Sequence, residues 1–377
     1  MKKAILASAF ALVSLLGATA QSSDSLAVTD SLGMMIGQMI LTGIGDFSDL
    51  DKKAPVFQSI KDGKVGSIIL FEKNLSPDNT SKKLKEIIQF AQNASPIPLF
   101  VSIDEEGGRV NRLKPKYGYP QTKSAQRLGT IGQPDSTYQY ALKTAGTLYQ
   151  LGINMNFAPT VDVNINPSNP VIGGLERSFS ADPDSVALHA EQVISAHETF
   201  GITTVLKHFP GHGSSEADSH LGLADVSSTW RFQELTPYSR LLDSGKVRAV
   251  MTAHIVNQVL DDRKIPATLS DRIISDVLRG LLDFEGVVVS DDMQMRAISA
   301  EYGLEEAIKM AIIAGVDILL FANNVPQYEL VTADQIHDII KSLVKNGDIT
   351  QERIAESYLR IMKLKADMML TAPIEDN

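Results

Sequence analysis

The sequence has 377 residues, 44% of them hydrophobic, which is enough apolar material for a sizeable core. Its formal net charge of −10 at pH 7 argues against a nucleic-acid partner, because nucleic-acid binding needs a basic surface. The chain has no cysteine, so disulfide bonds and thiolate chemistry are excluded.

The first twenty residues have the pattern of a secretory signal peptide. Two lysines precede an apolar run at residues 4–16, and an Ala-Thr-Ala triplet follows at residues 18–20. Basic, apolar and small residues in this order are typical of a cleaved signal, although a buried first helix would also fit. The run is too short to span a bilayer. We therefore expect a signal peptide at residues 1–20, export to a periplasm or beyond, and no stable membrane insertion after cleavage.

Eight short apolar, β-branched runs follow, with helical patterns between them. Their centres are Ile40, Ile69, Val101, Asn156, Val205, Val250, Val288 and Leu319. Near-continuous apolar strands that alternate with helices indicate a buried parallel sheet. A doubly wound open sheet would also fit, but eight βα units in about 350 residues favour a closed barrel. We predict an α/β fold of the (β/α)8 TIM type, as a single domain over residues 21–377.

Local signals mark several of the intervening helices. Ser76-Pro77 and Asp182-Pro183 each place a capping residue before a proline at the first helical position. Apolar residues then recur at helical spacing after both pairs, and again over residues 354–362. We expect helices to begin at both pairs and an amphipathic helix near the end of the chain.

Polar residues gather where the predicted strands end. The clusters are Asp104 with Glu106, Asp162, Lys207 with His208, His254, and Asp291 with Asp292. Active sites of such barrels lie at the carboxyl ends of the strands. We therefore expect these residues to converge on one face.

The stretch KHFPGHGSSEADSH, residues 207–220, contains three histidines. His208 and His212 are four apart, as in a helical zinc site, but Pro210 lies between them and breaks a helix. A zinc site on a loop and a solvated polar loop remain alternatives. Asp218 and His220 are close enough for the carboxylate to orient an imidazole that gives and takes a proton. We expect no metal.

Two further clusters leave alternatives open. Asp291 and Asp292 end a strand, so only one should face the barrel axis, as a nucleophile, base or metal ligand. The other would cap the next helix, and both could be caps. Asp104 lies near Arg112, with Arg177 on a later loop. These three could form ion pairs, or they could bind adjacent sugar hydroxyls.

Together, five motifs resemble family 3 of the glycoside hydrolases, and more closely its β-N-acetylglucosaminidase branch. They are IDEEGGRVNR, GGLERSFSADP, KHFPGHG with DSH after it, MTAH and VVVSDDMQM, in the family's order. The resemblance extends over about residues 36–365. KHFPGHG-x4-DSH is its specific part, because glucosidases of the family look different there.

The resemblance implies a role for each candidate residue. Asp291 is similar to the family's covalent nucleophile, and His220 to its acid/base, which Asp218 orients. The positions that match sugar-binding residues of the −1 subsite are Asp104, Arg112, Arg177, Lys207 and His208, with His254 as a polar residue near the site. The resemblance therefore implies a retaining exo-β-N-acetylglucosaminidase that needs no cofactor.

Several alternatives to this activity remain. A neutral imidazole would not repel phosphate, so a phosphorylase would also fit. So would a substrate-assisted mechanism, a β-glucosidase-type hydrolase and an inactive exported sugar-binding protein. We expect a monomer whose partner is a small glycoside ending in N-acetylglucosamine, such as a muropeptide fragment from cell-wall recycling. The signal peptide is a departure, because well-known Gram-negative relatives are cytosolic.

Overall fold

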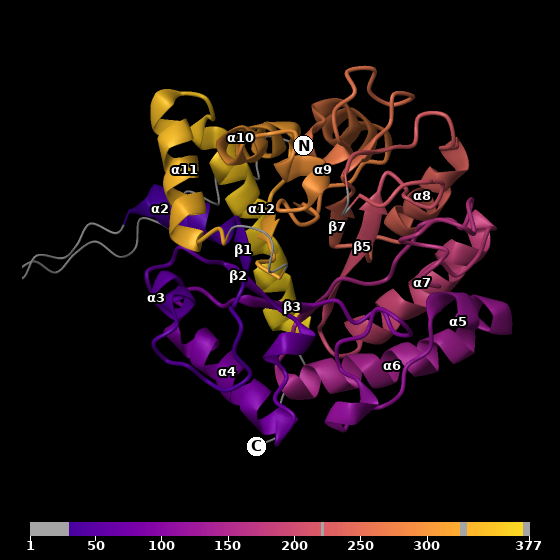
Figure 1. Cartoon of the computed structure of the whole chain (residues 1–377), viewed down its shortest axis with the longest axis horizontal. Helices are drawn as coiled ribbons and strands as arrows, with labels where there is room; N and C mark the ends of the chain where they lie inside the picture. The colour runs from indigo at the N-terminus through magenta and orange to yellow at the C-terminus, as the bar shows by residue number, and fades with distance from the viewer. Residues whose placement is uncertain (1–29, 220–221, 325–329, 372–377) are drawn as a thin grey trace, which may run out of the picture. The chain divides into compact units, whose positions relative to one another are not determined.

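Within the described residues of the computed structural model, eight parallel strands form one sheet. In sheet order they are β10 (Leu319–Phe321), β1 (Ile40–Gly43), β2 (Ser67–Leu70), β3 (Phe100–Ile103), β4 (Met155–Asn156), β5 (Thr203–Phe209), β7 (Ala249–Thr252) and β9 (Val287–Val289). A parallel bridge between Val289 and Ile318 joins the two ends of the sheet. The predicted (β/α)8 barrel is confirmed, and Figure 1 shows helices around it.

The structure describes residues 30–219, 222–324 and 330–371, with side chains up to residue 368. From Ser31 onward the chain forms one compact unit. The predicted signal peptide, residues 1–20, lies outside the described residues. No described helix has both the length and the apolar character needed to cross a membrane.

Helices connect successive strands and cover the outside of the barrel. They are α2 (Ser31–Gln38), α3 (Pro55–Lys61), α4 (Thr80–Ala94), α5 (Ala125–Ile131), α6 (Pro134–Leu151), α7 (Pro183–Glu198), α8 (Thr236–Asp243), the π-helical η5 (Arg272–Leu281), α9 (Arg296–Ser299), α10 (Leu304–Ala314), α11 (Ala333–Asn346) and α12 (Gln351–Thr371). Single 3-10 turns lie at η1 (Glu72–Asn74), η2 (Pro115–Tyr117), η3 (Phe232–Leu235) and η4 (Ala267–Leu269).

The local helix signals have mixed outcomes. Asp182 caps α7, because its carboxylate accepts the backbone N–H groups of Asp184 and Ser185. The start predicted at Ser76-Pro77 is wrong: α4 begins at Thr80, after Asn79 with a φ of 54°. The chain bends between the proline and Thr80, and Asn79 there has a left-handed backbone conformation, which asparagine tolerates.

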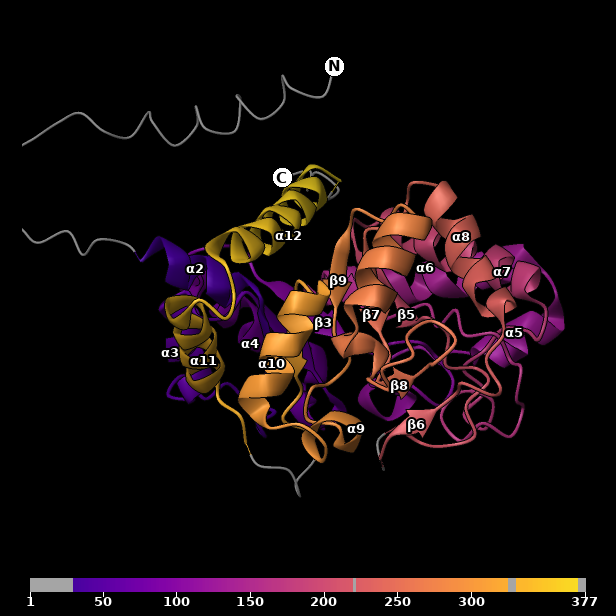
Figure 2. The same ribbon diagram turned by 90° about the horizontal axis from the view of Figure 1, so that it is seen from above.

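The strands are buried from end to end, so the barrel interior is a packed core and not a pore. The loops that follow the strands gather at one end. Strands β6 (Ala224–Asp225) and β8 (Ile255–Val256) pair there, within the loops after β5 and β7. In Figure 2 these two strands and α9 lie on the side away from α12. The candidate site lies at this carboxyl end.

Candidate active site

Lys207 is the centre of a buried ion-pair cluster. It belongs to β5 and only 2% of its side chain is exposed. Its ammonium nitrogen lies 2.7 Å from Asp104 Oδ1 and 2.6 Å from Glu106 Oε1. Both acids follow β3, so the fold brings the ends of two strands together around one charge, as expected from the sequence.

Two arginines complete this cluster. Arg177 donates two parallel hydrogen bonds to Glu106, at 2.9 and 2.7 Å, and Arg112 reaches Asp104 Oδ2 at 3.3 Å. Burial raises the pKa of both carboxyl groups, but the cations beside them hold each pKa below its usual value: Lys207 and Arg112 for Asp104, and Arg177 and Lys207 for Glu106. The acids are therefore ionised at neutral pH. Asp104 keeps 19% of its side chain exposed, so it can reach a ligand.

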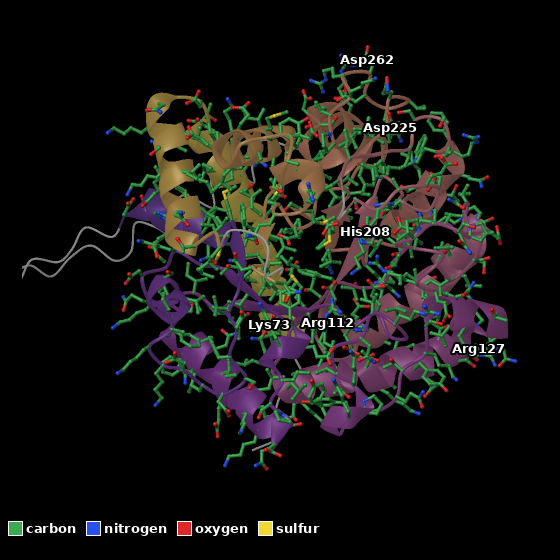
Figure 3. All side chains as sticks on the ribbon, in the orientation of Figure 1. Lys73, Arg112, Arg127, His208, Asp225 and Asp262 are labelled. Carbon is green, nitrogen blue, oxygen red and sulfur yellow. The ribbon has the colours of Figure 1, made fainter. Side chains whose placement is uncertain are left out.

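His208 continues the network toward Asp162. Its Nδ1 lies 2.7 Å from Asp162 Oδ2, and an Arg177 guanidinium nitrogen lies 3.2 Å from its Nε2. A guanidinium can only donate, so Nε2 accepts and the ring proton is on Nδ1, where it is donated to Asp162. Asp162 thus fixes the orientation of a histidine near the middle of the molecule (Figure 3).

Asp291 and Asp292 leave β9 half-buried. The backbone N–H of Asp292 donates to Asp291 Oδ1 at 2.8 Å. Asp292 Oδ1 itself accepts the backbone N–H groups of Gln294 and Ala322, at 3.2 and 3.1 Å. The helix-capping role predicted for one aspartate is wrong, because Met295 precedes α9. Asp292 instead ties the end of β9 to the end of β10.

His254 follows β7 and is almost fully buried. Its Nδ1 lies 2.8 Å from Thr268 Oγ1, and its Nε2 lies 2.9 Å from the carbonyl oxygen of Asp292. The carbonyl can only accept, so Nε2 donates and supports the backbone beside Asp291. The substrate-binding role of His254 stays a prediction, while its contacts are those of a support.

The predicted proton-transfer dyad is only partly described. Asp218 is half-buried in the loop after β5, whereas His220 lies outside the described residues. Among the residues that are described, no three histidine, aspartate or glutamate side chains are grouped so that they could hold a metal ion. The alternative of a loop zinc site at His208 and His212 therefore gains no support from this geometry.

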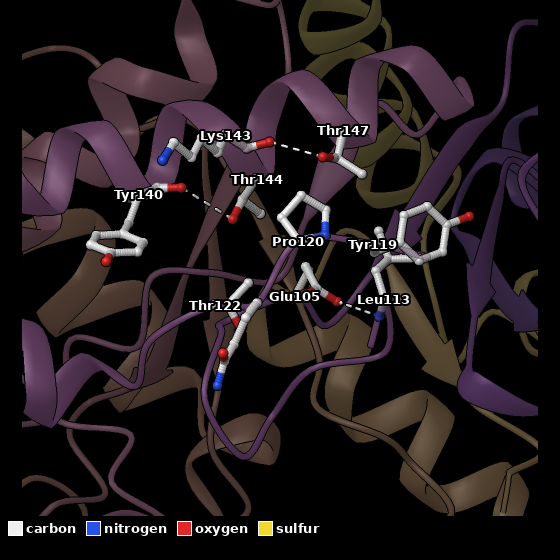
Figure 4. A pocket seen from close by; sticks show the side chains of 10 residues that line it. Glu105, Leu113, Tyr119, Pro120, Thr122, Tyr140, Lys143, Thr144 and Thr147 are labelled. Atoms are coloured by element: carbon white, nitrogen blue, oxygen red, sulfur yellow. Dashed lines mark hydrogen bonds between the residues drawn. The ribbon is translucent and has the colours of Figure 1, made fainter. Parts of the chain in front are cut away.

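Glu105, for which the sequence indicates no role, positions the Arg112 segment. It is 3% exposed, and its Oε2 accepts the backbone N–H groups of Arg112 and Leu113 at 2.8 and 3.0 Å. Figure 4 shows this carboxylate in a pocket beside Tyr119. Burial raises its pKa to about 7. The position of Glu105 directly after Asp104 was the only feature of the sequence that could have indicated its role.

We expect Glu105→Gln to change how stability depends on pH. The native pKa is raised above the unfolded value, so native Glu105 holds a proton that the unfolded chain releases between about pH 4.5 and 7. Its contribution is complete below pH 4.5 and is lost as pH rises through 7. Relative to the variant, the wild type should lose about 2–3 kcal/mol of unfolding free energy between pH 5 and 8. Urea unfolding at both pH values measures this, and a difference independent of pH would contradict it.

Residues 31–364 match the glycosyl hydrolase family 3 N-terminal domain. The chain belongs to this family. It is 35% identical over 324 residues to β-hexosaminidase A of Pseudoalteromonas piscicida, covering 81% of this chain and 54% of that protein.

Two solved structures are similar to this chain, and the first is that of a glycoside hydrolase family 3 protein. A β-N-acetylglucosaminidase from a Paenibacillus species superposes with a TM-score of 0.81 at 34% identity, over 92% of this chain and 64% of that one. A β-N-acetylhexosaminidase from Beutenbergia cavernae gives 0.77 at 27% identity, over 89% and 98%. This family 3 chain therefore spans little more than half of the Pseudoalteromonas protein, but nearly all of the Beutenbergia one.

Proposed function

We propose that the chain is an exo-β-N-acetylhexosaminidase that removes terminal β-linked N-acetylglucosamine with retention of configuration. The observation that carries the proposal is the buried cluster of Asp104, Arg112, Arg177, Lys207 and His208 at the carboxyl end of the barrel. It holds an ionised, partly exposed carboxylate between two cations. Adjacent sugar hydroxyls can donate to that carboxylate and accept from the cations.

Asp291 is the nucleophile in this proposal. Its carboxylate attacks the anomeric carbon, the glycosidic bond breaks, and a glycosyl-aspartate forms. Water then attacks the same carbon from the opposite face and releases Asp291. Two inversions give net retention. The tie from Asp292 to β10 and the bond from His254 hold the backbone beside Asp291 in place.

His220 is the acid/base, with Asp218 as its orienting carboxylate. It protonates the leaving-group oxygen in the first step and takes a proton from water in the second. No cofactor enters either step. We also propose that the chain is exported and acts as a monomer on small glycosides, such as muropeptide fragments.

Hydrolysis of 4-nitrophenyl N-acetyl-β-glucosaminide by the purified chain tests the activity. We expect nitrophenol and free N-acetylglucosamine with the β-configuration in the first NMR spectra. The 4-nitrophenyl glucoside should be a much poorer substrate. No nitrophenol from either compound would refute the proposal, and α-product would refute retention.

We expect His220→Ala to discriminate between leaving groups. Chitobiose has a poor leaving group that needs a proton, whereas nitrophenolate leaves without one. Loss of a general acid should therefore lower kcat/KM for chitobiose about 10²–10⁴-fold and for the aryl glycoside far less. Parallel kinetics on the two substrates measure the ratio. Equal losses on both would exclude the acid role.

A further inference from the structure

His212 has no role in the proposed chemistry, but it is buried between His208 of the proposed sugar subsite and Ser219, the residue after Asp218. It is 3% exposed. Its ring packs edge-on against the ring of His208, with centroids 6.0 Å apart and planes at 78°. Its Nε2 lies 3.2 Å from Ser219 Oγ. The imidazole thus lies between the proposed sugar subsite and the loop of Asp218.

The backbone of His212 is held firmly. Its N–H donates to Asp162 Oδ1 at 2.8 Å, and its carbonyl accepts from Asn169 Nδ2 at 2.7 Å. The next residue is Gly213, where an added Cβ would lie 1.7 Å from the carbonyl oxygen of Val163. The backbone after His212 therefore packs directly against the backbone of Val163, which fixes the position from which the His212 side chain extends.

The ring works as a neutral hydrogen-bonding group. Burial lowers the pKa of His212 to about 4, so the imidazole is uncharged at neutral pH. Within the described ranges its Nδ1 has no hydrogen-bond partner, which leaves Nε2 as the nitrogen that bonds. The partner of Nε2, Ser219, is itself 2% exposed and lies between Asp218 and His220 in the chain.

We propose that His212 is a positioning residue that holds the Asp218–Ser219 segment at the sugar subsite through its bond to Ser219. This inference rests on the proposed function. The buried carboxylate of Asp162 accepts hydrogen bonds from both His208 and His212. It therefore sets the position of His208, which the proposed function assigns to sugar binding, and of His212, which contacts Ser219. A misplacement of about 1 Å can cost a catalytic group roughly 10²-fold in rate.

The test compares His212→Phe, Ser219→Ala and the double variant. Phenylalanine keeps a planar aromatic ring but has no nitrogen to bond Ser219, and alanine at residue 219 removes only the hydroxyl group. Each single variant should lower kcat/KM for chitobiose by roughly 10–100-fold and for the 4-nitrophenyl glycoside by less than about 5-fold. The double variant should be no worse than either single one, because both remove the same bond.

His189→Phe is the matched control. His189 is also a buried histidine bonded to a hydroxyl, at 2.7 Å from Thr137 Oγ1, and its ring stacks on Phe179. This variant should leave the substrate ratio unchanged, even if its Tm falls. Equal losses on both substrates, or additive effects in the double variant, would overturn the inference. If the wild type cleaves neither substrate, the proposed function fails instead.

Discussion

Asp291→Ala should reduce turnover roughly 10⁴-fold or more, even on activated aryl glycosides. Without the carboxylate there is no covalent intermediate, and a protonated leaving group does not compensate for that loss. The substitution removes few atoms and the Asp291 side chain is half-exposed, so the fold should tolerate it. Steady-state kinetics with the 4-nitrophenyl substrate measure the loss.

Azide makes this test specific. It can enter the space that Asp291 vacates and attack the anomeric carbon once, giving a glycosyl azide of inverted configuration and restoring nitrophenol release. Asp262→Ala is the control, because Asp262 is an exposed acid at the edge of the molecule (Figure 3). Activity of the Asp291 variant within about 10-fold of the wild type would contradict the nucleophile assignment.

Lys207→Met should be the most destabilising of the changes considered. The Lys207 ammonium group forms ion pairs with two buried carboxylates. Removing one partner of a buried ion pair leaves a charge without compensation, which lowers the free energy of unfolding by about 3–5 kcal/mol. Asp104 and Glu106 keep one arginine each, so the chain should still fold. We expect kcat/KM to fall at least 10²-fold as well, because Asp104 loses its fixed position.

Urea unfolding and aryl glycoside kinetics test both parts. Arg109→Met is the control: it removes an ion pair to Glu176 in which the arginine side chain is 59% exposed. Exposed pairs contribute at most about 1 kcal/mol, so this variant should resemble the wild type. If Lys207→Met lowered the free energy of unfolding by less than about 1 kcal/mol, the ion pairs of Lys207 would not contribute to stability as proposed.

The barrel could be predicted because its signals are local. Each strand is a short apolar run, and most of the runs end in polar or glycine-rich residues, so the polar clusters at these ends were expected to meet on one face. Asp104, Lys207 and His208 therefore converged as expected. Arg177 joins them from a loop; the sequence left it as an ion-pair or sugar-binding residue, and the family resemblance favoured sugar binding.

Features that depend on distances across the barrel could not be predicted. Nothing local indicates that Glu106 binds Arg177 and Lys207, because the partners are about 70 and 100 residues away. For the same reason the sequence predicted a helix-capping role for Asp291 or Asp292, whereas the structure shows that Asp292 accepts the backbone N–H of Ala322, 30 residues away. The contact of His212 with Ser219 depends on how the loop folds back on itself.

Strand β1 finds its second neighbour only near the end of the chain. Ile40 pairs with Leu319, so the first barrel strand along the described chain cannot form hydrogen bonds on this side until the last barrel strand has been synthesised. Until β10 is available, β1 presents an open edge to other chains. Contacts of such long range also slow folding. A ribosome-bound or truncated chain that ends before Phe321 should therefore have an unclosed barrel and be prone to aggregate.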